Sequence, residues 1–351
     1  MNSEKTFVIR PKHISEHLNE MLNSLLSDHS FTVVSDSNSI PEMNNSRIIA
    51  AVELDKAGYC IPVFEIISAL YERGYDSLEG SQAVLLINSP NEMNTKSTAA
   101  DIIFQLNQLG CAFPGHPVVE ATGSLSNFLT WQKSMNMSLK DICLEMCRKL
   151  GERFFYQEFL QVDNPKILAL HSSNQKISNT LALWNIIKHK LCNIDITELH
   201  VENGKVLDCK GCSFKTCIHF SKQSSCFYGG ILVEEIYPAI EASDAIVWIC
   251  PNYNDAISAN LTAVINRLTA LYRKTSFQTK ALFGVVVSGN SGSDSVAMQL
   301  LDALCINKGF FLPPRFALMA TANDPLSILG TPNLEATASA FADNIMKTLK
   351  K

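Results

Sequence analysis

Apolar and polar positions along the chain follow a pattern that predicts short strands, each followed by an amphipathic helix. Apolar runs at Thr6–Arg10 and Lys166–His171 predict the first strand of each half, and apolar residues recur at helical spacing in about Ser15–Leu26 and Asn179–Leu191. Strands that alternate with helices are typical of parallel sheets covered on both faces. The sequence therefore predicts an α/β protein with doubly wound parallel sheets.

The second half of the chain repeats the pattern of the first at an offset of about 200 residues. Ser81–Thr122 and Thr279–Thr321 each read as an apolar strand, a polar loop, an amphipathic helix, a glycine and a strand ending in Ala-Thr. The preceding segments, Arg47–Gly74 and Asp244–Arg273, each read as a buried strand, a loop and a helix. This predicts an internal duplication, although two unrelated α/β domains would alternate similarly.

Two domains are predicted, at residues 1–160 and 165–351. The boundary is placed near Gln157–Pro165, after a long helix at about Ser138–Phe155. The second half takes about 80 residues from its first strand to its third, against about 40 in the first half. The extra length includes a cysteine-rich insertion at 209–226.

Composition narrows the classes of function. Hydrophobic residues make up 46% of the 351 residues and charged residues 18%, which favours folded domains over disorder. The net charge of −5 and the lack of a basic stretch exclude nucleic acid and anionic membranes as expected partners. The chain has no apolar run of roughly 18 residues, as a membrane span needs, and begins without a signal peptide. A cytoplasmic protein is expected.

Four of the eleven cysteines fall within eighteen residues, with the spacing C-x2-C-x4-C-x8-C. Thiolates suit soft metals and iron–sulfur clusters, and an odd number of cysteines in a chain without a signal peptide indicates thiols or ligands instead of disulfides. The predicted metal ligands are Cys209, Cys212, Cys217 and Cys226. Buried thiols are predicted at Cys60, Cys111, Cys192, Cys250 and Cys305, and Cys143 and Cys147, one helical turn apart, are expected inside the first half.

Three loops follow predicted strands in the second half, where ligands of such sheets bind. His171–Thr180 is rich in hydroxyls and helix-start amides that fit a phosphate, or Ser178 or Asn179 simply caps the helix. Cys250–Asp255 offers a proline and a tyrosine as a wall for a planar ring, or forms a turn with a packed tyrosine. Ser288–Ser293 has glycines that allow close approach of a ligand, or is an ordinary loop.

The order of these motifs over about Lys166–Lys351 resembles that of the flavodoxin-like NAD(P)H-dependent FMN reductase family, especially its iron–sulfur flavoprotein branch. The family's first loop, Gly-Ser-x-Arg-x-x-Ser-Asn-Thr, is matched by Ser172 and Ser178–Thr180, and its Pro-x-Tyr by Pro251–Tyr253. The helix after that loop commonly ends in Asp-Arg, here Asn266-Arg267, and the family's cysteine-rich loop precedes a strand that is matched by Glu241–Val247.

The resemblance implies two flavodoxin-like domains, the second of which binds FMN and uses NAD(P)H as a transient donor. Carried over by position, the FMN phosphate contacts Ser172, Ser178, Asn179 and Thr180. The flavin ring contacts Pro251, Asn252, Tyr253, Asn254, Ser288 and Gly289. His171 stands where the family usually has Gly, and the family's loop Arg is missing. No catalytic residue is nominated, because the cofactor supplies the chemistry; His171 and Tyr253 are the polar residues of first interest.

The cysteines allow three interpretations. The iron–sulfur branch has C-x2-C-x2-C followed by a fourth cysteine, whereas the later gaps here are four and eight residues. A four-iron four-sulfur cluster, a packed loop without metal, and a structural zinc site with His219 as a substitute ligand all fit this pattern.

The first half lacks the flavin motifs, since Arg10–His13 and Glu53–Lys56 replace the Ser-rich loop and Pro-x-Tyr. We interpret it as a degenerate flavodoxin-like copy without flavin. Because the family forms dimers, the resemblance implies a pseudo-dimeric monomer or a homodimer.

The predicted function is an FMN-dependent oxidoreductase that moves electrons between NAD(P)H or a protein donor and a small-molecule or protein acceptor, with an iron–sulfur cluster as an optional relay. An electron-transfer or assembly flavoprotein without a small substrate is one alternative. A non-flavin binding protein with a structural cysteine loop is the other.

Overall fold

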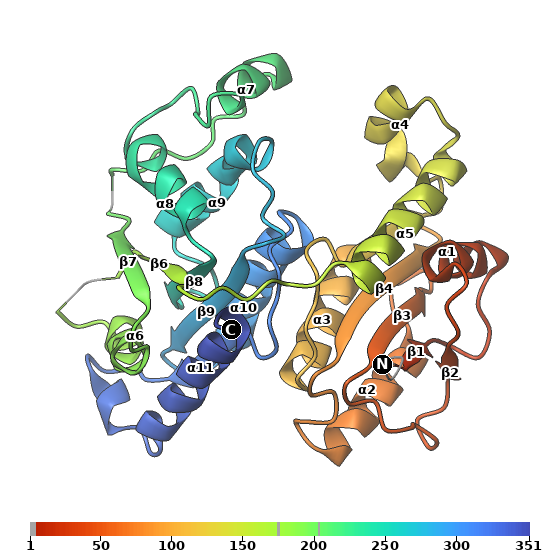
Figure 1. The fold of residues 1–351 in the computed structure, drawn as a ribbon, viewed down its shortest axis with the longest axis horizontal. Coiled ribbons are helices and arrows are strands. Elements are labelled where there is room, and N and C mark those ends of the chain that lie inside the picture. The colour runs from red at the N-terminus through yellow and green to blue at the C-terminus, as the bar shows by residue number, and fades with distance from the viewer. Residues whose placement is uncertain (1–4, 174–175, 203) are drawn as a thin grey trace. The chain divides into compact units, whose positions relative to one another are not determined.

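A computed structural model of the chain describes residues 5–173, 176–202 and 204–351. The chain divides into two compact units, Met1–Glu158 and Phe159–Lys351. Each unit has a parallel sheet between layers of helices (Figure 1). In the part of the chain that the structure describes, no helix combines the length and apolarity that crossing a bilayer requires.

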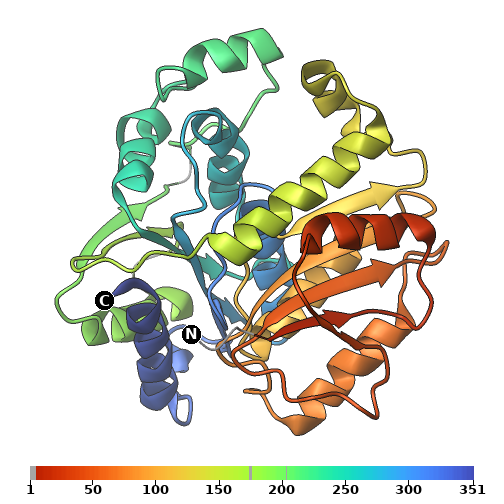
Figure 2. The same ribbon diagram turned by 45° about the vertical axis from the view of Figure 1, so that its right-hand side comes forward.

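The first unit has a five-stranded sheet in the order β2-β1-β3-β4-β5, with every pair of neighbours parallel. Helices α1 and α5 pack together on one face, as Figure 2 shows, and α2 and α3 cover the other. The elements are β1 (Thr6–Ile9), α1 (Glu16–Leu26), β2 (Thr32–Val34), β3 (Arg47–Glu53), α2 (Ile61–Arg73), β4 (Gln82–Ser89), α3 (Thr95–Gln108), β5 (Val118–Thr122), a 3-10 turn (Ser126–Phe128), α4 (Leu129–Met135) and α5 (Leu139–Tyr156).

Helix α1 shows why these segments adopt their structure. Ser15 caps its first turn by accepting a hydrogen bond from the Leu18 N–H at 3.2 Å, which satisfies one of the unpaired donors of a helix start. Leu18, Met21, Leu22 and Leu25 are spaced at three and four residues and lie buried in one cluster. The same cluster takes up apolar residues of α5, so the two helices cover the sheet as one layer.

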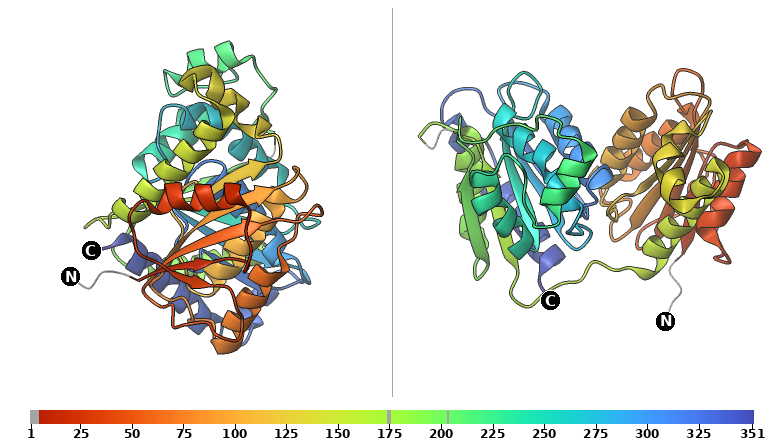
Figure 3. Two further views of the ribbon diagram at one scale, coloured as in Figure 1. Left: turned by 90° about the vertical axis from the view of Figure 1, so that its right-hand side faces the viewer. Right: turned by 90° about the horizontal axis from the view of Figure 1, so that it is seen from above.

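The second unit has the same architecture, with the sheet order β7-β6-β8-β9-β10 and parallel neighbours throughout. Helices α6 and α11 contact each other on one face, and α8, α9 and α10 cover the other (Figure 3). The elements are β6 (Lys166–His171), α6 (Asn179–Lys190), β7 (Asp195–His200), α7 (Phe214–Ser221), a π-helical turn (Leu232–Ile236), α8 (Tyr237–Ala242), β8 (Ala245–Pro251), α9 (Ala259–Tyr272), β9 (Ala281–Ser288), α10 (Ser293–Leu300), a second π-helical turn (Leu301–Ile306), β10 (Ala317–Thr321), a 3-10 turn (Ser327–Gly330) and α11 (Leu334–Leu349).

Counted within each unit, both sheets run in the strand order 2-1-3-4-5, which is the flavodoxin-like form of the doubly wound fold. This confirms the predicted fold class of two such domains in tandem. The order reverses between the first and third strands of each unit, so the carboxyl ends of β6 and β8 flank the position where ligands of this fold bind.

The two units share a small feature of backbone geometry after their last strands. Leu125 and Leu326 both have positive φ, 54° and 57°, and each precedes a short 3-10 turn. Positive φ is uncommon for a residue with a bulky side chain. The same unusual conformation at the same place supports the predicted duplication, which stays a prediction.

The units differ between their second and third strands. In the second unit this connection contains α7, the first π-helical turn and α8, and it carries the cysteine-rich segment. In the first unit, no described residue between β2 and β3 is helical. The extra length predicted from the sequence is therefore an insertion that follows the edge strand β7.

Candidate functional site

The loop between β6 and α6 presents the start of a helix at the carboxyl end of the sheet. Ser178 caps α6, because its hydroxyl accepts a hydrogen bond from the Leu181 N–H at 3.2 Å. Ser172 Oγ lies 2.6 Å from Ser258 Oγ, a contact that ties this loop to the start of α9. Two of the predicted phosphate-binding hydroxyls thus lie at the switch in strand order, and one of them is engaged as a cap.

The other predicted phosphate contacts of this loop are used differently. The Asn179 side chain donates to the backbone oxygens of residues 322 and 324, at 3.1 and 2.9 Å, and accepts from the N–H of residue 328. Thr180 is buried. Ser173, which was not predicted, is only 1% exposed and its hydroxyl has no partner among the described residues. Asn174 and Gln175 lie outside those residues.

His171 ends β6 as a buried ring beside the partly exposed side chains of His200 and Glu198. Its ring stacks on His200 with centroids 4.7 Å apart, and its Nε2 lies 3.7 Å from Glu198 Oε1. Glu198 accepts hydrogen bonds from Trp184 Nε1 at 3.0 Å and Lys188 Nζ at 3.1 Å. Burial, followed by the neighbouring His200, lowers the pKa of His171, so the imidazole resists protonation.

The loop after β8 is a tight turn that holds a tyrosine in solvent. Tyr253 and Ala256 pair through backbone hydrogen bonds of 3.4 and 3.2 Å, while Asn254 and Asp255 between them have φ of 55° and 56°. Two successive positive φ values define a type I′ turn, a conformation that Asn and Asp tolerate better than most residues. Pro251 is buried at the end of β8, and Tyr253 is 55% exposed.

Asn252 joins the loop after β8 to the loop after β9. Its Nδ2 donates to Ser288 Oγ at 2.9 Å and to Asp255 Oδ1 at 3.0 Å, and its Oδ1 accepts from the Asp255 N–H at 2.7 Å. Ser288 Oγ also lies 2.7 Å from Ser293 Oγ at the start of α10. These bonds make the two loops one unit, with Gly289 exposed at its edge.

The three loops follow three neighbouring strands, β6, β8 and β9. A helix start, hydroxyl groups and an exposed aromatic ring converge there. Sequence reasoning did not name Ser173, Ser258 and Ser293 as site residues, although Ser173 and Ser293 belong to loops that were singled out and Ser258 lies three residues after one of them. This edge of the sheet therefore has the geometry of a ligand site of the doubly wound fold.

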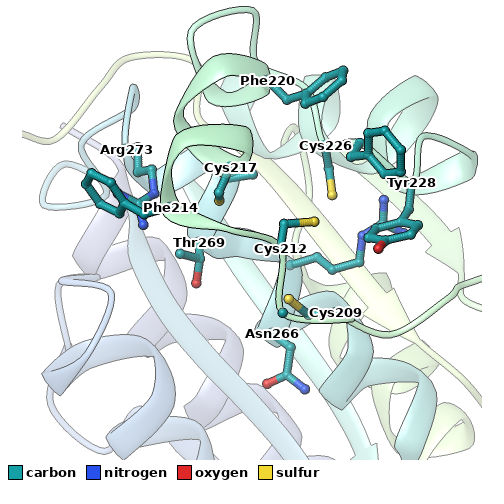
Figure 4. Close-up of a pocket in the computed structure, with 14 residues that line it drawn as sticks. Cys209, Cys212, Phe214, Cys217, Phe220, Cys226, Tyr228, Asn266, Thr269 and Arg273 are labelled. Carbon is teal, nitrogen blue, oxygen red and sulfur yellow. The ribbon is translucent and has the colours of Figure 1, made fainter.

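The four clustered cysteines line one cavity of about 280 Å³ beside α9. Figure 4 shows their side chains around a common space, with Cys217 on α7 and the other three on loops. Cys209 is exposed and the others are half-buried, all as free thiols. A hydrogen bond with Cys212 raises the pKa of the Tyr228 hydroxyl, which lines the same cavity.

The cavity is not a preassembled metal site. In the stretches that the structure describes, no group of three or more His, Cys, Asp or Glu side chains is arranged to hold a metal ion. His219, the substitute zinc ligand, is exposed, packs edge-on against Phe220 and is not among the residues lining the cavity. Metal binding by the cysteines stays a prediction.

The remaining cysteines agree with the predictions except at one position. Six of them are buried: Cys60, Cys111, Cys143, Cys147, Cys250 and Cys305. Cys192 was predicted to be buried but is exposed, because it follows the last turn of α6, where the chain leaves the helix layer. Burial raises the pKa of the Cys111, Cys250 and Cys305 thiols, so they are unreactive packing groups.

The first unit has a carboxylate where the second has its open helix start. Glu53, at the end of β3, accepts a hydrogen bond from the Ser15 N–H at 2.8 Å and another from Asn88 Nδ2 at 2.7 Å. Asn88 also donates to Ser15 Oγ at 3.0 Å. The start of α1 thus already faces a negative group from its own chain, which satisfies the attraction of a helix N-terminus for anions.

The chain was compared with known proteins. Residues 165–324 match the family described as NADPH-dependent FMN reductase. No curated protein matches the chain.

Similar solved structures include RosB with a bound intermediate, 8-demethyl-8-formylriboflavin-5'-phosphate (13% identity, covering 53% of this chain and 79% of that chain, TM-score 0.41). Others are the apo form of an NADH:FMN oxidoreductase, EMOB (15%, 54% and 91%, TM-score 0.36), and a putative quinone reductase from Klebsiella pneumoniae (14%, 52% and 84%, TM-score 0.38). Over residues 165–324, the C-terminal unit is similar to the NADPH-dependent FMN reductase family.

Proposed function

We propose that the second unit binds FMN at the carboxyl ends of β6, β8 and β9 and works as an oxidoreductase that takes electrons from NAD(P)H or a protein donor. The observation that carries this proposal is the convergence of three hydrogen-bonded loops on the switch in strand order, within a segment that matches the FMN reductase family. When bound, FMN supplies the hydride and electron chemistry.

The helix start of α6 suits the phosphate end of the cofactor. Its first N–H groups and the positive end of the helix dipole attract a phosphate, and Ser172 and Ser178 add hydroxyls. Ser173 supports this assignment, because its buried hydroxyl has no partner among the described residues, and such a hydroxyl is costly unless a ligand or water completes it. Asn179 acts indirectly, since its side chain holds the segment after β10 against the helix start.

The loops after β8 and β9 suit the ring end. The type I′ turn presents the exposed Tyr253 as an aromatic wall after the buried Pro251, and Asn252 fixes the turn to Ser288. Asn254 and Gly289 are exposed at the rim, where backbone groups can meet the ring edge. These residues bind and orient; none of them needs to exchange a proton for the proposed activity.

The proposal is tested with purified chain incubated with FMN and then freed of unbound cofactor. The expected result is about one FMN per chain, because the chain has one proposed site. The loaded protein should oxidise NADH or NADPH when quinone or free flavin is the acceptor. Asn252→Ala should weaken FMN binding, because it disconnects the two ring-side loops. A chain that retains no flavin after incubation would refute the proposal and favour the non-flavin alternative.

We further propose that the cysteine cavity holds a redox centre of the iron–sulfur type that exchanges electrons with the flavin. Four thiols lining one cavity is the supporting observation, and soft thiolate ligands suit such a cluster. Anaerobic reconstitution should give iron and acid-labile sulfide together with broad visible absorption. Cys212→Ala should abolish that absorption and keep the flavin bands, whereas Cys192→Ala, outside the cavity, should keep both. Absence of iron and sulfide would refute this part alone.

A second candidate function follows from the same cavity. If flavin and cluster pass electrons only between proteins, NAD(P)H turnover should be slow with every small acceptor while a chemical reductant still reduces both centres. This outcome would favour an electron carrier without a small substrate.

For the first unit we propose a flavodoxin-like copy that binds no flavin. Glu53 at the start of α1 supports this, because a phosphate there would lie against a carboxylate. The copy would serve as a built-in counterpart of a family dimer partner. Two FMN molecules per chain would contradict it, and a dimer in solution would favour the homodimer over the pseudo-dimeric monomer.

A further inference from the structure

A buried cation is one of the residues that line the cysteine cavity. Arg267 lies on α9, is 3% exposed and is one of the residues that line the cavity. Its Nη1 donates to the Leu207 carbonyl at 3.2 Å and its Nη2 donates to the Gly229 carbonyl at 2.9 Å. Its Nε is buried without a hydrogen-bond partner among the described residues.

The two carbonyls that Arg267 holds flank the cysteine segment. Leu207 comes two residues before Cys209, and Gly229 comes three residues after Cys226. One guanidinium group therefore joins the point where the chain enters the segment to the point where it leaves. A planar fork of donors is suited to such bridging, and a lysine ammonium is not.

Neighbouring contacts strengthen this anchor. Asn266 Nδ2 donates to Asp208 Oδ1 at 2.9 Å, and the Cys209 N–H donates to the same oxygen at 2.6 Å. The Tyr237 hydroxyl donates to the Arg267 carbonyl at 2.6 Å. The base of the segment is thus fixed to α9, while the cysteines between its ends surround the cavity.

The charge of Arg267 lacks a partner of opposite sign. In the described stretches of the chain, no carboxylate forms an ion pair with it, and its bonds go to neutral carbonyls. A buried charge is unfavourable unless an opposite charge compensates it. Two further cations lie near aromatic residues that line the cavity: Lys210 lies 5.3 Å from the centre of the Tyr228 ring, and Arg273 lies 4.7 Å from that of Phe214.

The thiols are the groups in this cavity that can supply the missing negative charge. Four thiolates around a divalent ion leave a net negative charge, and so does an iron–sulfur cluster held by four thiolates. We propose that Arg267 is the positioning residue and fixed counter-charge of an anionic thiolate–metal centre in this cavity. This inference rests on the proposed metal-binding role of the cysteines, not on flavin binding.

The test uses Co²⁺ as the probe, added to reduced, metal-free full-length protein, because cobalt bound by thiolates gives an intense charge-transfer absorption. Arg267→Gln removes the charge and the bridge, and Arg267→Lys keeps the charge without the bridge. Arg273→Gln is the matched control, because Arg273 is a cation that lines the same cavity but has an exposed side chain. Iron and sulfide content after reconstitution, and FMN content, are measured on every variant.

Wild type should bind Co²⁺ with the thiolate absorption. Arg267→Gln should weaken binding at least tenfold, Arg267→Lys by roughly three- to tenfold, and Arg273→Gln by less than threefold. Equal affinities for the Arg267 and Arg273 variants would overturn the role of Arg267. Wild type that binds FMN but no Co²⁺ would overturn the centre and leave the flavin proposal standing. If Arg267→Gln fails to fold, unchanged affinity in Arg267→Lys overturns the proposal and weakened affinity supports it.

Discussion

Gly292 is the position at which a single methyl group tests the geometry of the proposed ring site. It has φ of +90° and precedes α10, and a Cβ built on it would lie 2.0 Å from Asp255 Oδ1 and 3.1 Å from Asn252 Nδ2. Gly292→Ala therefore combines backbone strain with a clash against the side chains that join the loops after β8 and β9. Asp255 must move, and its 3.0 Å hydrogen bond with Asn252 breaks.

Backbone strain and the lost hydrogen bond together set the expected loss in free energy of unfolding. A non-glycine residue held at positive φ costs about 1–3 kcal/mol, and the lost hydrogen bond adds about 1 kcal/mol. Gly292→Ala should lower the free energy of unfolding of the second unit by about 2–4 kcal/mol. At about 2–4 °C per kcal/mol for a domain of this size, its Tm should fall by about 4–16 °C. The displaced loop should also weaken FMN binding roughly fivefold, which corresponds to the hydrogen-bond term.

Thermal unfolding of the FMN-free protein and quenching of FMN fluorescence measure the two effects. Gly330→Ala is the control, because a Cβ there meets no atom within 4 Å and the backbone is not in the positive-φ region. In the double variant Asp255→Ala with Gly292→Ala, the clash is absent and the Asn252–Asp255 hydrogen bond is lost only once. Its loss in free energy of unfolding should therefore be smaller than the sum of the losses in the two single variants. If Gly292→Ala matched Gly330→Ala in both Tm and FMN affinity, the described joining of the two loops would be wrong.

Three further predictions concern single residues. Ser178→Ala should lower the free energy of unfolding by about 1 kcal/mol and weaken FMN binding. Ser15→Ala, which removes the matching cap of α1, should lower the free energy of unfolding similarly and leave FMN affinity unchanged. Urea unfolding and FMN titration measure the two effects, and equal FMN affinities of the two variants would refute the phosphate assignment. Burial lowers the pKa of His171 in the folded chain, so as the pH falls through about 6.5 the imidazole takes up a proton in the unfolded chain before it does so in the folded chain. The free energy of unfolding should therefore fall with pH until the pH passes below the pKa of His171 in the folded chain. His171→Gln should flatten this fall in urea unfolding between about pH 7.5 and about pH 5, and an unchanged slope would exclude His171 as its source. Glu53→Gln should lower the stability of the first unit by roughly 0.3–1 kcal/mol, measured by thermal unfolding, and no loss would argue against its stabilising the start of α1.

Local patterns predicted the elements well because strand and helix periodicity reflect which face is buried. The strand Lys166–His171 has the predicted bounds, and the predicted helix at about Ser15–Leu26 differs from α1 only in counting its cap. The common plan of the two halves was also visible, since the same sheet order imposes the same succession of apolar segments.

Tertiary contacts in the site could not be predicted in this way. Asn179 matched a phosphate-loop motif, yet its amide bonds to a segment more than 140 residues away. Arg267 was visible only as half of an Asn-Arg pair, and its burial under the cysteine segment depends on how that insertion folds back on α9. Cys192 had an apolar neighbourhood in sequence but falls where the chain emerges from the helix layer.

Because Glu53 occupies the start of α1, the stability of the first unit should not depend on the concentration of a cofactor, in contrast to that of the second unit. The first unit carries an internal anion 2.8 Å from the Ser15 N–H, so no dissolved molecule is required to complete the start of α1. In the proposed function, the corresponding position of the second unit is filled by FMN, which would stabilise that unit by mass action, by about 2.7 kcal/mol at a hundredfold excess over Kd. Flavin starvation would then loosen one half of the chain while the other half keeps its full resistance to unfolding and proteolysis.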